Sequence, residues 1–147
     1  MRAPYTQLYL HCVWSTYKRL PLILPGIQQR VYAGISAKCR ELNCHVLAIG
    51  GDVDHVHLFV RFPTTLAVAT LLKEVKGATS QLVNHEIAPG EAFRWQGGYG
   101  AFTVSKRSAE SVTAYVRNQR GRHANRQLID ELERCEEHDD YAREEIE

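Results

Sequence analysis

The seven residues Asp54-His55-Val56-His57-Leu58-Phe59-Val60 constrain the fold of this chain more than any others. Side chains alternate between the two faces of an extended strand, so the two histidines lie on one face while Val56, Leu58 and Val60 lie on the other. This strand can therefore pack one face on a core and present two imidazoles, which are common metal ligands, on the other. A His-x-His pair also occurs on ordinary protein surfaces, and alone it leaves metal binding and a surface role both open.

Further strands and helices are expected on both sides of this stretch. Runs of aromatic and apolar residues predict strands at 5–14, 45–50, 55–62 and about 101–104. Apolar residues at helical spacing predict helices at 26–43, at 65 to about 87 and at 108 to about 123. The buried stripe of the second helix is expected to contain Leu66, Ala69, Leu72, Val75, Leu82 and Val83, and Ser108 is expected to be the N-cap of the third helix.

The order of these segments indicates the fold class. Strand, helix, strand, strand, helix, strand is the ferredoxin-like arrangement. Residues 51–54 supply the turn of a hairpin between the second and third strands, and Pro63 is expected to end the third strand. We therefore expect an α+β protein with an antiparallel four-stranded sheet, packed helices and one added helix after the last strand.

Length and composition favour one domain inside the cell. With 147 residues, 44% of them hydrophobic, the chain can bury one sizeable core. The first residues lack a basic stretch followed by a long apolar run, and no run of about 18 apolar residues occurs, so we expect a cytoplasmic protein without a membrane segment. The four cysteines form no CxxC pair and are expected to be reduced and mostly buried.

The net charge of +1 combines two oppositely charged parts. Residues 1–129 carry 16 basic and 7 acidic residues, whereas residues 130–147 carry ten acidic and two basic residues. We therefore divide the chain into a domain at 1–129 and an acidic C-terminal tail at 130–147. The basic domain can attract a polyanion at low salt. An ordinary solvated surface, or a tail folded back over the basic patch, would have the same composition.

The third predicted helix carries a second pair of polar residues. Tyr115 and Gln119 stand four residues apart, so a phenol and an amide oxygen lie on one face of that helix. Together with the two histidines they suggest a tyrosine nucleophile assisted by a metal ion. Either residue alone is uninformative, because Tyr115 continues the apolar stripe of Val112 and Val116 and is equally suited to core packing.

Four ordered blocks of the chain resemble the single-tyrosine HUH transposases of the insertion-sequence 200/605 type, over most of residues 5–126. The blocks are His11-Cys12-Val13-Trp14-Ser15-Thr16, His55-Val56-His57, Trp95-Gln96-Gly97-Gly98-Tyr99-Gly100-Ala101-Phe102-Thr103-Val104-Ser105 and Tyr115-Val116-Arg117-Asn118-Gln119. The block that begins at Trp95 is the most specific of the four. Val53 is a departure, because relatives often have a proline before the Asp-His-x-His run.

The resemblance implies a transposase that cleaves and rejoins single-stranded DNA. Tyr115 would be the catalytic nucleophile. A divalent ion, Mg²⁺ or Mn²⁺, would be held by His55, His57 and Gln119 and would polarise a phosphate oxygen. Attack on phosphorus would leave a 5′-phosphotyrosine link and a free 3′-hydroxyl, and the reverse attack would join another end without ATP. No general base is evident from the residues.

The same resemblance implies a homodimer that binds imperfect DNA hairpins at the ends of an element, since two ends need two tyrosines. The sequence leaves open whether Tyr115 acts with the histidines of its own subunit or with those of the partner. Candidate DNA contacts are Lys18, Arg19, Lys106, Arg107, Arg117, Arg120 and Arg122. About half of such basic residues are expected to be ordinary solvated side chains.

Three alternative functions stay open. A noncatalytic single-stranded nucleic-acid-binding module would need neither a divalent ion nor Tyr115. A metal-dependent hydrolase would activate water at the histidine pair and would leave no DNA attached to the protein. A domesticated relative that processes chromosomal palindromes would share the transposase chemistry and differ only in its DNA substrate.

Overall fold

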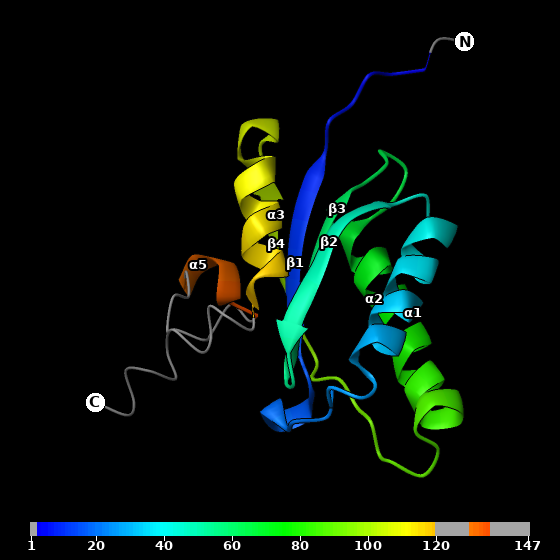
Figure 1. Cartoon of the computed structure of the whole chain (residues 1–147). Helices are drawn as coiled ribbons and strands as arrows, with labels where there is room; N and C mark the ends of the chain where they lie inside the picture. The colour runs from blue at the N-terminus through cyan, green and yellow to red at the C-terminus, as the bar shows by residue number, and fades with distance from the viewer. Residues whose placement is uncertain (1–2, 120–129, 136–147) are drawn as a thin grey trace.

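Four antiparallel strands form a sheet in the order β2-β3-β1-β4 (Figure 1). The computed structural model describes residues 3–119 and 130–135 of the chain. Within them the strands are β1 (Tyr9–Ser15), β2 (His45–Asp52), β3 (His55–Arg61) and β4 (Gly100–Val104). This strand order, with a helix in each of the two long connections, is that of a ferredoxin-like fold and confirms the predicted fold class.

Helices cover both faces of the sheet (Figure 1). On one face α1 (Gln28–Glu41) packs against α2 (Val68–Leu82), and on the other lie α3 (Ala109–Arg117) and α5 (Asp130–Glu133). Shorter helical turns are η1 (Tyr17–Arg19), η2 (Val83–Ile87) and η3 (Lys106–Ser108). None of the helices in the described ranges is both long enough and apolar enough to cross a membrane.

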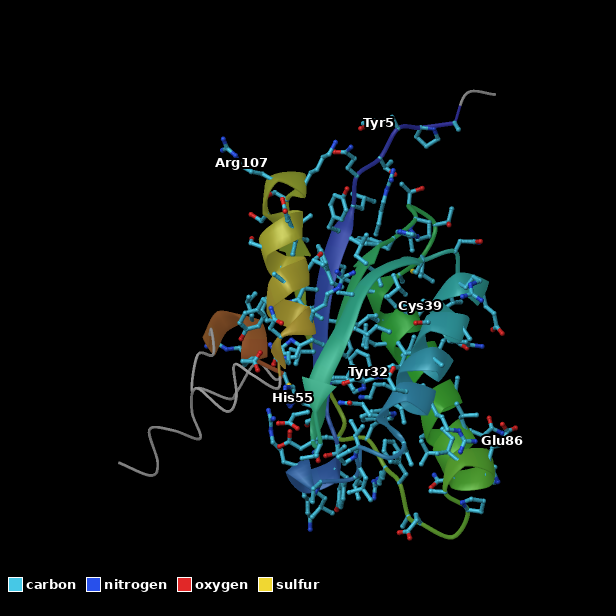
Figure 2. The ribbon with its side chains drawn as sticks, in the orientation of Figure 1. Tyr5, Tyr32, Cys39, His55, Glu86 and Arg107 are labelled. Atoms are coloured by element: carbon cyan, nitrogen blue, oxygen red, sulfur yellow. The ribbon has the colours of Figure 1, made fainter. Side chains whose placement is uncertain are left out.

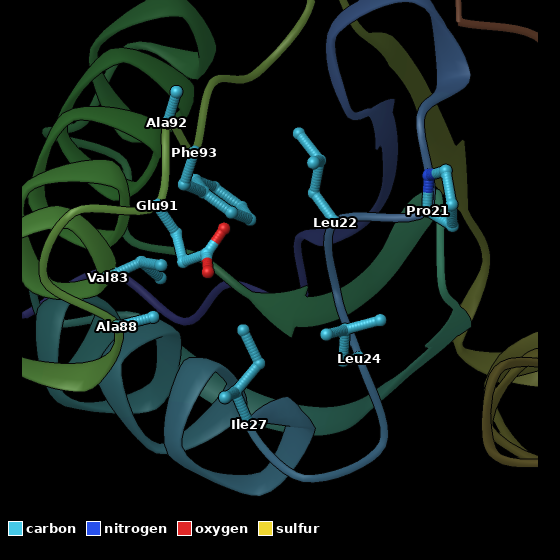
Figure 3. A pocket seen from close by; sticks show the side chains of 9 residues that line it. All are labelled: Pro21, Leu22, Leu24, Ile27, Val83, Ala88, Glu91, Ala92 and Phe93. Carbon is cyan, nitrogen blue, oxygen red and sulfur yellow. The ribbon is translucent and has the colours of Figure 1, made fainter.

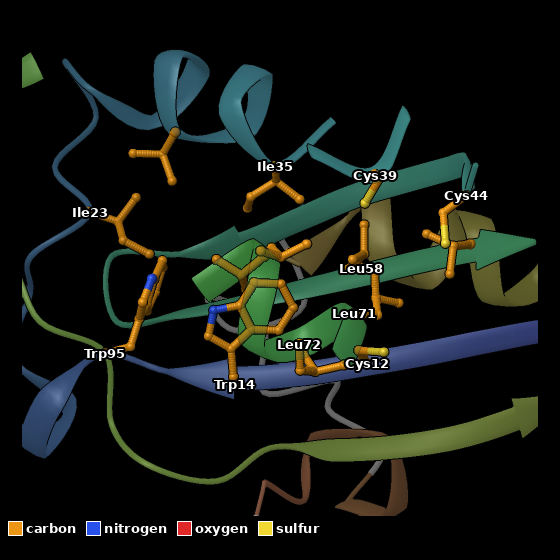
Figure 4. Packing of buried hydrophobic residues seen from close by; sticks show 14 of the residues in the cluster. Cys12, Trp14, Ile23, Ile35, Cys39, Cys44, Leu58, Leu71, Leu72 and Trp95 are labelled. Carbon is orange, nitrogen blue, oxygen red and sulfur yellow. The ribbon is translucent and has the colours of Figure 1, made fainter. Parts of the chain in front are cut away.

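The main hydrophobic core lies between the sheet and the helices α1 and α2 (Figure 4). Val56, Leu58 and Val60 of β3 are buried there, as the alternation of the strand predicts. The two helices contribute Val31, Ile35, Cys39, Leu71, Leu72 and Val75. All four cysteines are buried free thiols, as expected.

A second, smaller cluster holds α3 against the opposite face of the sheet. Phe59 and Ala48 of the sheet pack against Val112 and Val116 of α3. Gly50 permits this close approach, because a Cβ at that position would lie 1.8 Å from the carbonyl oxygen of Val116. α3 therefore lies directly over β2 and β3, on the face where β3 presents its histidines.

Two local predictions are wrong. β1 begins at Tyr9 and not at residue 5. The two neighbouring strands both end opposite Tyr9, so residues 5–8 have no partner strand with which to form a β-ladder. Ala69 is exposed and Leu71 is buried instead. The buried face of α2 is centred on Leu72 and Val75, and Ala69 lies outside it.

The start of α3 agrees with the prediction in position but lacks the capping hydrogen bond. Ser108 stands at the N-cap position, but its backbone is already helical, at φ −93° and ψ −3°, and its side chain makes no cap hydrogen bond. A capping residue has an extended backbone, and here the turn η3 precedes the helix and removes that geometry. α3 ends at Arg117, and residues 120–123 of the predicted helix lie outside the described residues.

Candidate active site

The histidine pair lies on the face of the sheet that α3 covers. His55 and His57 are 1% and 0% exposed, and the residues paired with them on β1 are Ser15 and Val13. Both imidazoles point to this face, as predicted, and their ring centroids are 5.1 Å apart. Since both rings are buried, their nitrogens must find polar partners within the protein.

Tyr115 and Gln119 approach the histidines from α3 and the residues that follow it. Tyr115 is 2% exposed, and its ring centroid lies 6.0 Å from that of His57. Gln119 is fully buried, and its Oε1 lies 3.3 Å from Nε2 of His55. The structure therefore brings together the four residues singled out by strand and helix spacing, and all four belong to one chain.

Glu133 of α5 completes this cluster and was not predicted from the sequence. Its Oε2 lies 2.8 Å from Nε2 of His57 and accepts a hydrogen bond of 3.1 Å from the Tyr115 hydroxyl. Its Oε1 lies 3.7 Å from Nε2 of His55. Glu133 is one of ten acidic residues in 130–147, and no pattern in the sequence distinguishes it from the others.

Each histidine is oriented by a neighbour at its other ring nitrogen. Nδ1 of His55 lies 2.8 Å from Oδ1 of Asp54, and Nδ1 of His57 lies 2.7 Å from Nε2 of His11. An ionised Asp54 can only accept, so it holds a proton on Nδ1 of His55 and leaves Nε2 facing the cluster. His11 lies in one of the sequence blocks quoted above and Asp54 directly precedes another. That position was the only feature of the sequence that could have indicated a role for them.

The donor atoms at this place suit a divalent cation. One ligand atom each from His55, His57 and Glu133 can be chosen so that all of them lie within 4.8 Å of one another. Imidazole nitrogens suit transition metal ions, and the oxygens of Glu133 and Gln119 suit Mg²⁺ and Mn²⁺. The cluster can therefore hold a metal ion, and its mixed ligands do not fix which one.

A basic and aromatic patch lies beside the cluster. The backbone N–H of Thr16 donates to the carbonyl oxygen of Asp54, which ties the start of η1 to the turn before β3. Nζ of Lys18 lies 5.3 Å from the ring centroid of Tyr17, and the guanidinium carbon of Arg94 lies 4.5 Å from it. Arg94 was not among the predicted DNA contacts, although its neighbours in this patch were.

Two predicted DNA contacts have protein partners. Nη2 of Arg19 lies 3.9 Å from Sγ of Cys135, which follows α5. Nη2 of Arg117 donates to the carbonyl oxygen of Leu47 on β2 at 3.3 Å. Both side chains are exposed, so these contacts leave room for a phosphate.

The other predicted DNA contacts are not gathered at the cluster. Arg107 lies at the opposite end of the molecule from His55 (Figure 2), and Lys106 precedes it in η3. Arg120 and Arg122 lie outside the described residues.

An apolar hollow lies elsewhere in the molecule (Figure 3). It has a volume of about 280 Å³ and is lined by Pro21, Leu22, Leu24, Ile27, Val83, Ala88, Glu91, Ala92 and Phe93. Most of these residues belong to the core on the α1 and α2 side of the sheet, so the hollow is separate from the histidine cluster.

Known transposases resemble this chain in sequence pattern and in fold. The family model described as "Transposase IS200 like" matches residues 4–119. A structure from Deinococcus radiodurans R1, described as a candidate transposase, has a TM-score of 0.66 at 19% identity and covers 81% of this chain and 95% of that one. A REP-associated tyrosine transposase bound to a REP hairpin has a TM-score of 0.58 at 15% identity, over 79% of this chain and 68% of that one. No curated protein matches the chain.

Proposed function

Because the chain belongs to the IS200-like transposase family, we propose that it cleaves and rejoins single-stranded DNA through a 5′-phosphotyrosine intermediate. Tyr115 is the nucleophile. A divalent ion, Mg²⁺ or Mn²⁺, would be held by His55, His57 and Gln119. The family match ends at Gln119, so all four residues lie within the region shared with the family.

One observation carries the proposal, and it is the convergence of polar groups around the tyrosine. His55 and Gln119 are 64 positions apart in the chain, yet their side-chain atoms come within 3.3 Å, and the ring of Tyr115 packs edge-on against His57. Core packing of Tyr115 would not require buried imidazoles and a buried amide beside it, because each buried polar group costs free energy unless it is hydrogen-bonded.

The chain's own contribution to metal binding is to orient the donors. Nε2 of Gln119 donates to the carbonyl oxygen of Tyr115, which turns Oε1 of the amide toward His55. Donors that are already oriented lose less entropy when they bind an ion. When bound, a divalent ion supplies the charge that polarises a phosphate oxygen of the scissile bond.

Tyr115 performs the bond exchange. Its phenolic oxygen forms a bond to phosphorus while the bond from phosphorus to the 3′ oxygen breaks. The tyrosine loses a proton and the 3′ oxygen gains one, so one phosphodiester replaces another and the reverse attack needs no ATP. In the structure the Tyr115 hydroxyl donates to Glu133, which must give way to a phosphate before the attack.

We extend to this chain the kind of substrate with which the REP-associated relative was solved, a DNA hairpin. Lys18, Arg19 and Arg94 supply positive charge beside the site, where Lys18 and Arg94 lie over the ring of Tyr17. More distant parts of the hairpin would contact Lys106, Arg107, Arg117, Arg120 and Arg122.

Two copies of the chain would act together, because an element has two ends and each chain supplies one such tyrosine. The domain at 1–129 would carry the reaction, with 130–147 as its acidic tail. An enzyme of a mobile element and a domesticated relative acting on chromosomal palindromes would use the same residues. The palindromes that flank the gene distinguish the two.

A covalent protein–DNA adduct tests the proposal. The full-length protein is incubated with labelled single-stranded DNA from the flanks of its own gene, with Mn²⁺ or with EDTA, and separated on a denaturing gel. We expect an adduct only with the metal, absent in Tyr115→Phe and present in Tyr9→Phe. Tyr9 is a matched control, because it packs in the same cluster beneath α3, with its ring 6.1 Å from that of Phe59.

Each alternative function gives a different gel. DNA that is retained on a native gel but forms no adduct with any metal would indicate a noncatalytic binding module. Cleavage without an adduct that survives Tyr115→Phe would indicate a hydrolase. Either result would contradict the proposed function.

A further inference from the structure

His11 lies beside the proposed metal site and is not one of its proposed ligands. Its side chain is fully buried on β1. Nε2 of His11 lies 2.7 Å from Nδ1 of His57, and the two rings stack with centroids 5.0 Å apart and planes 15° apart. The two imidazoles are therefore held in one relative orientation.

Phe102 is a second neighbour of the His11 ring. The ring centroids of Phe102 and His11 are 5.9 Å apart. Nδ1 of His11 has no hydrogen-bond partner in the ranges 3–119 and 130–135. A neutral imidazole with one buried, unpaired nitrogen costs stability that an apolar ring of similar size would not. Packing alone therefore does not account for a histidine here.

We propose that His11 is a positioning residue whose hydrogen bond to Nδ1 of His57 sets the orientation of that ring, with Nε2 directed at the proposed metal site. The proposal rests on the proposed metal site and deepens it. A metal ion held by Nε2 of His57 would need the lone pair of that nitrogen, and the ring proton would then be on Nδ1. Nε2 of His11 is placed to accept the hydrogen bond from that Nδ1–H, and such a contact raises the affinity of the ligand for metal.

A histidine, rather than a carboxylate, at position 11 fits two different occupants of the site. With Oε2 of Glu133 2.8 Å from Nε2 of His57, this contact favours a proton on that nitrogen. With a metal ion bound at this nitrogen, the nitrogen would have to present a lone pair. Neutral His11 can donate to or accept from His57 and so tolerates both states, whereas an ionised carboxylate can only accept. Asp54 is such a fixed acceptor for His55.

Mn²⁺ binding to the full-length protein, measured by isothermal titration calorimetry, tests this role without DNA cleavage. We expect His11→Phe, which keeps a stacked ring and removes both nitrogens, to weaken binding by about 10- to 100-fold. His11→Gln, whose amide can accept or donate, should remain within a few-fold of the wild type. Phe102→Leu is the matched control with wild-type affinity, because it alters packing on His11 and spares the hydrogen bond to His57.

Nitrogen-15 NMR of the metal-free protein gives a second readout. The ring-nitrogen shifts of His57 report how the proton is shared between Nδ1 and Nε2. We expect this balance to change in His11→Phe and to be retained in His11→Gln. A residue that only filled space would not move it.

Wild-type Mn²⁺ affinity in His11→Phe would overturn the proposal. Equal losses of affinity in His11→Phe and His11→Gln, accompanied by a lowered melting temperature, would also overturn it, because they would indicate packing alone. His57→Ala tests the metal site separately from the role of His11. Unchanged Mn²⁺ binding in that variant would overturn the metal site itself. Binding that is lost in His57→Ala and intact in His11→Phe would contradict only the role of His11.

Discussion

The thiol of Cys39 lies in the core between α1 and the sheet and has no exposed surface (Figure 4). Burial raises its pKa from the ordinary 9.0 to about 12, and the neighbouring Cys44 acts in the same direction. Burial likewise raises the pKa of Cys12. These thiols are therefore protonated and unreactive in the folded protein, although none of them forms a disulfide.

The free energy of unfolding is expected to fall as the pH rises above 9. Below about pH 9 the Cys39 thiol is protonated in both states, whereas above it the unfolded chain loses the proton and the folded protein keeps it to about pH 12. Each buried thiol of this kind then lowers the free energy of unfolding by about 1.4 kcal/mol per pH unit. Urea unfolding across this range measures the slope, and Cys39→Ala should reduce it. If the free energy of unfolding falls with pH equally steeply in Cys39→Ala, groups other than Cys39 are responsible for the fall.

The place of α3 over the sheet depends on the missing side chain of Gly50. A Cβ there would lie 1.8 Å from the carbonyl oxygen of Val116, so we expect Gly50→Ala to push α3 away from β2. Overpacking of this kind costs about 1–3 kcal/mol of stability. Mn²⁺ affinity should fall as well, because Tyr115 and Gln119 move with the helix. Urea unfolding and calorimetry measure the two effects.

Gly77→Ala is the control for this substitution. Gly77 lies within α2, and no atom would lie within 4 Å of a Cβ at that position. Alanine should stabilise the helix there by up to about 1 kcal/mol and leave Mn²⁺ binding unchanged. Full stability and full affinity in Gly50→Ala would show that α3 adjusts without disturbing the site.

The parts of the site that could be predicted are those that depend on local geometry. His55 and His57 are two residues apart in a strand, and Tyr115 and Gln119 are four residues apart in or just after a helix, so each pair shares a face whatever the rest of the chain does. The order of strands and helices then gave the fold class. The predicted face of β3 and the predicted helix do meet in the structure.

Contacts that depend on how distant segments pack could not be predicted. Ten acidic residues in 130–147 are alike in sequence, and only the docking of α5 on β1 and β4 selects Glu133. The contact of His11 with His57 depends on the register between β1 and β3. The start of β1 at Tyr9 depends in the same way on where its partner strands end.

In the structure of the single chain, Tyr115 lies beside His57 of the same copy. The Tyr115 hydroxyl and Nε2 of His57 both contact Oε2 of Glu133 in the same copy. We therefore expect a mixture of Tyr115→Phe and His57→Ala proteins to form no DNA adduct on a denaturing gel. An adduct in the mixture would show that the tyrosine of one subunit serves the histidines of the other, since only that arrangement would leave one intact site.

The site is also buried, and α5 places Glu133 against its tyrosine. Tyr115 and the three proposed metal ligands are at most 2% exposed, although a phosphodiester must contact the Tyr115 hydroxyl. The segment is closely fitted: a Cβ at Gly100 of β4 would lie 1.8 Å from the carbonyl oxygen of Arg134. The carboxylate of Glu133 thus lies where a phosphate must approach, and it has the same sign of charge.

Replacement of Glu133 is therefore expected to speed adduct formation. Glu133→Ala removes the carboxylate that pairs with His57 and accepts from the Tyr115 hydroxyl, so DNA and a metal ion meet less competition. At fixed Mn²⁺ and DNA, the rate should rise about tenfold for each 1.4 kcal/mol of competing interaction removed. Glu110→Ala, at an exposed acidic residue of α3, is the matched control and should leave the rate unchanged. Slower adduct formation with weaker Mn²⁺ binding in Glu133→Ala would contradict this expectation and would identify Glu133 as a metal ligand that the reaction needs.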